Sequence, residues 1–64
     1  MEDDTRDLIV QLCTRVGMIM EDASVVALTI GGLASEDRQT ALEEIRKAAE
    51  RISALVEAAR LMLD

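Results

Sequence analysis

The chain has no aromatic side chain, no histidine and no proline among its 64 residues. Without Phe, Tyr or Trp, no large ring can anchor a small core, and nucleic-acid bases find no stacking platform. Cys13 is the single cysteine, so an internal disulfide and a structural zinc site are both excluded. Small domains usually need a stabilising feature of this kind, and oligomerisation is the remaining one.

Basic residues are also scarce, with seven Lys and Arg against thirteen acids and a net charge of −6. This balance argues against nucleic acid as a partner. The longest uncharged run, from Ala23 to Ser35, is shorter than the about 20 residues that cross a bilayer, so no membrane partner is expected. The acidic start MEDDTRD does not resemble a secretory signal, and a lone cysteine fits a reducing compartment. These features predict a cytoplasmic protein.

Apolar residues recur at helical spacing in both halves of the chain, in steps of three and four. The stripe of the first half consists of Ile9, Leu12, Val16, Ile19, Ala23, Val26, Ile30 and Leu33. The stripe of the second half consists of Leu42, Ile45, Ala49, Ile52, Val56, Ala59 and Leu63. Each stripe has an adjoining apolar column. In the first half this column is formed by Cys13, Met20 and Ala27, and in the second half by Ala41, Ala48, Leu55 and Met62. The sequence does not decide which column faces the other helix.

The segment GGLASEDR separates the two stripes. Gly32 is expected in the left-handed conformation that closes many helices, with Leu33 folding back on Leu28. Ser35 is expected to cap the next helix. A connection this short makes the two helices antiparallel neighbours.

The prediction is therefore an all-α helical hairpin, a single domain over residues 1–64. It has a helix at about 4–31, a turn at about 32–35 and a helix at about 36–63. One continuous helix is the alternative, but it needs two adjacent glycines in its middle. In shape and length only, the hairpin resembles the Rop-type RNA-binding hairpin dimer, and no residue roles follow from that resemblance.

A single seam between two helices shelters too little apolar surface for a chain of this length. Met18, Val25 and Leu28 form a second apolar line on the first helix, away from its main stripe. A second copy is therefore expected to cover the first helix, which gives a homodimeric four-helix bundle. The candidate interface residues are Met18, Val25, Leu28, Ile19, Val26 and Ile30. A higher multimer and a different protein with a matching groove remain alternatives.

The sequence predicts a non-enzymatic, self-associating protein that acts through protein–protein contacts, as a small regulator or adaptor. No catalytic, metal or cofactor residues are expected, because acids and bases alternate along the second helix as in a solvated ion-pair face. Cys13 is predicted to be a small buried hydrophobe. One alternative is an obligate small subunit, or a secretion-chaperone-type partner, of a larger protein. A weaker one is RNA binding through Arg46, Lys47 and Arg51, among which glutamates are interleaved.

Overall fold

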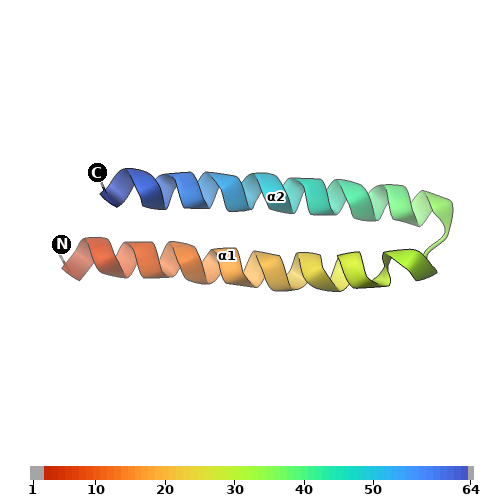
Figure 1. Ribbon diagram of the computed structural model, residues 1–64, viewed down its shortest axis with the longest axis horizontal. Coiled ribbons are helices and arrows are strands. Elements are labelled where there is room, and N and C mark those ends of the chain that lie inside the picture. Colours follow the sequence, from red (N-terminus) through yellow and green to blue (C-terminus); the bar gives the residue numbers. More distant parts are fainter. Residues whose placement is uncertain (1–2, 64) are drawn as a thin grey trace.

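The computed structural model describes residues 3–63, which form two long antiparallel helices (Figure 1). Helix α1 spans Asp3–Thr29, the short 3-10 helix η1 spans Ile30–Gly32, and α2 spans Ser35–Leu63. The helices lie side by side over their length, so that the two ends of the chain lie at the same end of the hairpin. The predicted all-α hairpin is confirmed, and residues 3–63 contain no strand.

The charges at the helix ends agree with the helix dipoles. Asp3 and Asp4 lie in the first turn of α1, and Glu36 and Asp37 lie in the first turn of α2. Carboxylates stabilise a helix N-terminus because its unpaired N–H groups carry partial positive charge. Arg60 lies in the last turn of α2, where a cation is favourable for the opposite reason.

The turn closes differently from the expected left-handed glycine. No residue in the range 3–63 has a positive φ, so Gly32 is not left-handed. Instead, α1 tightens into η1, and the N–H of Leu33 donates a hydrogen bond to the carbonyl of Ile30 at 3.2 Å. Leu33 then turns extended, with φ −91° and ψ 153°. Leu28 remains 83% exposed, so the predicted contact between Leu33 and Leu28 is wrong.

The start of α2 also lies one residue earlier than predicted. The carbonyl of Ala34 accepts a hydrogen bond from the N–H of Arg38 at 2.9 Å. Ser35 is already helical, so Ala34 occupies the N-cap position and the prediction of Ser35 as the cap is wrong. The chain therefore passes from η1 into α2 through Leu33 and Ala34 alone.

The seam between the helices follows the predicted stripe on α1 but a shifted one on α2. The partly covered residues of α1 and η1 include Ile9, Leu12, Val16, Ile19, Ala23, Val26 and Ile30. On α2 the covered residues are Ala41, Ile45, Ala48, Ile52, Leu55, Ala58 and Ala59. Four members of the predicted α2 stripe are exposed instead, namely Leu42, Ala49, Val56 and Leu63. The adjoining column brings the small Ala41 and Ala48 against α1, which lets the backbones approach closely.

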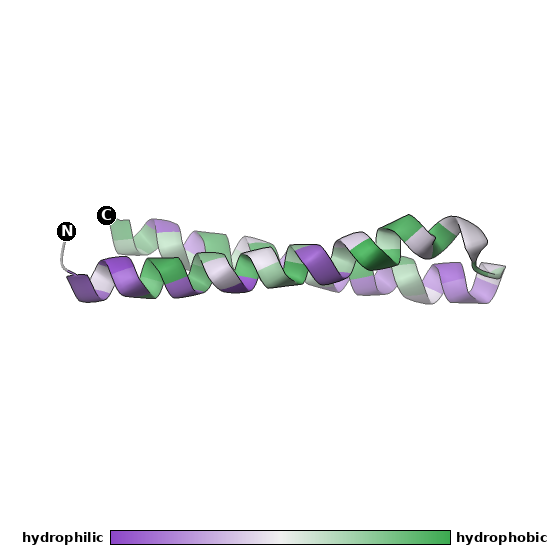
Figure 2. Cartoon of the chain, turned by 90° about the horizontal axis from the view of Figure 1, so that it is seen from below, coloured by the Kyte–Doolittle hydropathy of each residue, from purple (hydrophilic) through white to green (hydrophobic). Residues whose placement is uncertain are grey.

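The hairpin is long and thin, with extents of 49 × 15 × 10 Å. Figure 2 shows α1 crossing in front of α2 at a shallow angle, with hydrophobic and hydrophilic residues both present along its visible surface. Ala41, at 5% exposure, is the only buried residue in the part of the chain that the structure describes. One seam therefore leaves most apolar side chains at least partly open to solvent.

Candidate interaction surface

The seam divides the hairpin into two sides of different chemistry. Several charged residues come directly before a seam residue along the chain, and four of them are Arg15, Asp22, Glu44 and Arg51. Asp22, Glu44 and Arg51 line one groove between α1 and α2, and Arg15 and Arg51 line its continuation. We call these four residues the charged flank. Both helices therefore contribute charged residues to this side of the hairpin.

On the opposite side, Arg46 and Arg60 also follow seam residues directly, but the other residues that do so are mostly apolar or small. Six of these are Cys13, Met20 and Ala27 of α1, and Leu42, Ala49 and Val56 of α2. A residue advances about 100° around a right-handed helix, measured along the direction of that helix. In two antiparallel helices, the residues that directly follow the seam residues of each helix therefore lie on the same side of the hairpin. The six residues, which we call the apolar flank, thus share the side opposite the groove.

Every member of the apolar flank is exposed in the hairpin. The exposed fractions of its larger side chains are 54% for Met20, 57% for Leu42 and 43% for Val56. Cys13 is also exposed, so the prediction of a buried cysteine is wrong for the hairpin by itself. The column of Cys13, Met20 and Ala27 lies next to the seam of α1 but does not face α2. The flank is thus a two-helix surface that nothing in the chain covers.

The residues of the predicted interface fall on two different surfaces. Ile19, Val26 and Ile30 are partly covered, within the seam between the helices. Met18, Val25 and Leu28, which we call the outer line, are 61%, 63% and 83% exposed. The outer line is formed by residues of α1 alone. The structure therefore separates the outer line from the seam residues predicted with it.

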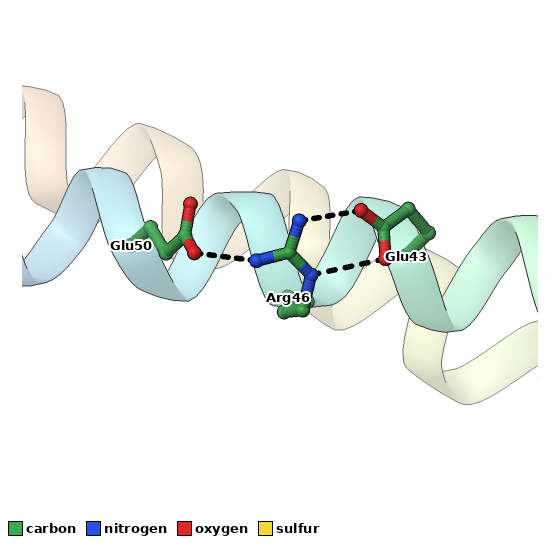
Figure 3. Close-up of polar contacts among 3 residues, drawn as sticks. All are labelled: Glu43, Arg46 and Glu50. Atoms are coloured by element: carbon green, nitrogen blue, oxygen red, sulfur yellow. Dashed lines mark hydrogen bonds and ion pairs between the residues drawn. The ribbon is translucent and has the colours of Figure 1, made fainter.

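The exposed surface of α2 is organised by ion pairs. Arg46 lies between Glu43 and Glu50 and contacts both carboxylates (Figure 3). Its Nε donates a hydrogen bond to Oε2 of Glu43 at 3.0 Å, and Nη1 donates to Glu50. The hydrogen bond from Arg46 lowers the pKa of Glu43, and the same pair raises the pKa of Arg46 above its ordinary value. Two carboxylates thus neutralise the first residue of the candidate basic patch.

The other two candidate basic residues have acidic neighbours as well. Lys47 and Arg51 line the groove together with Asp22 and Glu44. The basic charge is therefore divided between an ion-pair cluster and a mixed groove. Phosphate binding needs cations that are not already engaged by carboxylates. The arrangement weakens the RNA-binding alternative.

Within residues 3–63, no three His, Cys, Asp or Glu side chains gather where they could hold a metal ion. No helix of the described chain has the length and apolar character that crossing a membrane requires. The chain matches no known family model, no curated protein and no solved structure. The chemistry of its own surfaces is therefore the basis for a functional proposal.

Proposed function

We propose that this chain self-associates into a four-helix bundle of two hairpins and acts through protein–protein contacts, as a small non-enzymatic regulator or adaptor. The observation that carries the proposal is the exposed area of 5098 Å² for a chain of 7.0 kDa. A compact monomer of that mass exposes about 4,000 Å². Because the exposed residues include many large apolar side chains, the excess area favours burial against another chain.

The dimensions of the hairpin support the same proposal. Its radius of gyration is 15.0 Å, whereas a compact chain of this length has about 11 Å. A compact chain of twice the length has about 14 Å. Two hairpins packed side by side would thus have the proportions of an ordinary four-helix bundle. The length of each helix is matched to such an assembly and poorly matched to a folded monomer.

The acidic residues support a contact role over a catalytic one. Glu43 and Glu50 are exposed and held by Arg46, and such surface pairs add solubility and modest helix stability. Asp22 and Glu44 lie beside Lys47 in an open groove. In both places the carboxylates lie beside bases and are open to solvent, as on a surface of ion pairs.

A second candidate function is an obligate subunit, or a secretion-chaperone-type partner, of a larger protein. The outer line favours it, because Met18, Val25 and Leu28 stay open whenever α1 packs only on α2. A groove of a larger protein could bind such a line at helical spacing. Methionine adapts readily to different partner surfaces.

Thermal unfolding at several protein concentrations tests the proposal. When folding and association are coupled, the midpoint rises with protein concentration by mass action. We expect a single cooperative transition whose midpoint increases across a hundredfold concentration series. The second candidate predicts a broad, weak transition for the purified chain at every concentration. A sharp transition with a constant midpoint contradicts both.

A further inference from the structure

We infer that the occupant of the apolar flank is a second copy of this chain, which packs its own apolar flank against it. The inference rests on the proposed self-association and specifies its surface. The apolar flank combines three residues of α1 with three of α2 and contains no charge. A two-fold contact between two such flanks stacks one helical layer on another, which is the geometry of a four-helix bundle.

The other two surfaces are less suitable for this contact. Docking on the charged flank would remove Arg15, Asp22 and their neighbours from water, and desolvating charges is costly. The outer line is supplied by one helix, and Glu21 interrupts it between Met18 and Val25. Contact along one helix covers fewer side chains than contact along two. The apolar flank therefore offers an uncharged surface on both helices, at a lower desolvation cost than the charged flank.

The area to be covered agrees with one ordinary interface. The exposed 5098 Å² exceeds that of a compact monomer by about 1,000 Å². A standard protein–protein interface buries about 800 Å² on each partner. One contact between two copies is thus sufficient to bring the exposed area of each chain close to that of a compact protein.

The apolar flank also has a stepped surface. Residues at similar distances from the short turn lie level with each other on antiparallel helices. Counted from the turn, Cys13 lies nearly level with Val56, and Met20 with Ala49. Ala27 of α1 is in turn closest in level to Leu42 of α2. Each level therefore pairs a small side chain with a larger one, and a second stepped surface can interlock with it at native packing density.

Two alanine substitutions on α2 test the inference. Ala49 and Ala54 are both exposed, but Ala49 lies on the apolar flank and Ala54 lines the groove with Arg15 and Arg51. Ala49→Glu would bury two unpaired carboxylates in the dimer, whereas Ala54→Glu places a carboxylate near two arginines. We expect Ala49→Glu to reduce the mass in solution to that of one chain. Ala54→Glu should keep the wild-type mass, with unchanged helical circular dichroism.

The outcomes separate this inference from the proposed function. A dimeric wild type with an equally dimeric Ala49→Glu overturns the apolar flank as the contact and leaves self-association standing. A dimer lost in Val25→Glu but kept in Ala49→Glu assigns the contact to the outer line. A monomeric wild type contradicts the proposed function itself.

Cys13 provides a second measurement that does not depend on a variant folding. Its thiol is exposed in the hairpin and lies on the apolar flank. In the dimer of wild-type protein, we expect a maleimide to modify Cys13 about tenfold more slowly than after dilution to the monomer, because burial restricts access to the thiol. Equal rates for dimer and monomer would overturn the inference.

Discussion

Arg38 reaches back across the turn to Gly31, where its Nη2 donates a hydrogen bond to the backbone carbonyl at 3.2 Å. The two residues lie on either side of the connection, in α2 and η1. A carbonyl at the end of a helix has no partner within the helix, and a basic side chain can satisfy it. The bond therefore ties the beginning of α2 to the end of the preceding helical segment.

Replacing Arg38 with alanine should loosen the turn. The loss of one hydrogen bond from a charged donor at an exposed site is expected to lower the free energy of unfolding by about 0.5–1.5 kcal/mol. Urea denaturation at one fixed protein concentration measures the change. Arg60→Ala is the matched control, because Arg60 only approaches Glu57 at 3.6 Å on the surface of α2. Equal effects of the two substitutions would mean that the bond to Gly31 does not stabilise the turn.

Glu43 should show a dependence on its partner in a pH titration. The hydrogen bond from Arg46 lowers the pKa of Glu43 below its ordinary value of 4.5. The charged form is thus favoured in the folded state, and its contribution to stability is present above that ordinary value. The contribution is lost as the pH falls through the lowered pKa. In Arg46→Met, NMR titration should show the pKa of Glu43 moving up, and an unchanged pKa would contradict the ion pair.

Ala41 should tolerate no larger side chain, because it is 5% exposed and lies in the seam. We expect Ala41→Leu to lower the free energy of unfolding by about 1–3 kcal/mol, since the extra atoms force the helices apart. Ala54→Leu, at an exposed alanine of the same helix, is the control and should change stability by less than about 0.5 kcal/mol. A neutral Ala41→Leu in chemical denaturation would show that the seam is placed wrongly.

Gly17 should be replaceable by alanine. It lies within α1, and a Cβ atom built on it meets no other atom within 4 Å. Alanine is favoured over glycine inside a helix by about 1 kcal/mol, so Gly17→Ala should raise the unfolding midpoint. Loss of stability, or of the dimer, would instead show that another backbone packs closely at this position.

The stripe on α1 could be predicted from the sequence because steps of three and four continue without a break from Ile9 to Ile30. The stripe on α2 could be predicted only in part. Ile45 and Ile52 lie in the seam as expected, but Leu42 and Val56 do not. Periodicity cannot separate two apolar columns that are one residue apart. The choice between them depends on which column allows α1 to approach closely, and that is tertiary information.

The apolar flank could not be predicted as one surface for a related reason. Met20 and Ala49 lie in different halves of the chain, and only the antiparallel arrangement brings their columns to one side. The sequence did carry a signal for this surface. Charged residues directly before the seam, such as Asp22 and Glu44, mark the side of the hairpin opposite the apolar flank. The prediction of a left-handed Gly32 was wrong because a 3-10 turn can end a helix without any positive φ.

The central claim is that one hairpin exposes more apolar surface than a stable monomer can leave in water. Sedimentation equilibrium of the purified wild-type chain tests this claim most directly. We predict a mass of twice the chain mass of 7.0 kDa at micromolar concentration, with dissociation on dilution. A monodisperse species of the single-chain mass, with cooperative unfolding at the same concentration, would contradict it.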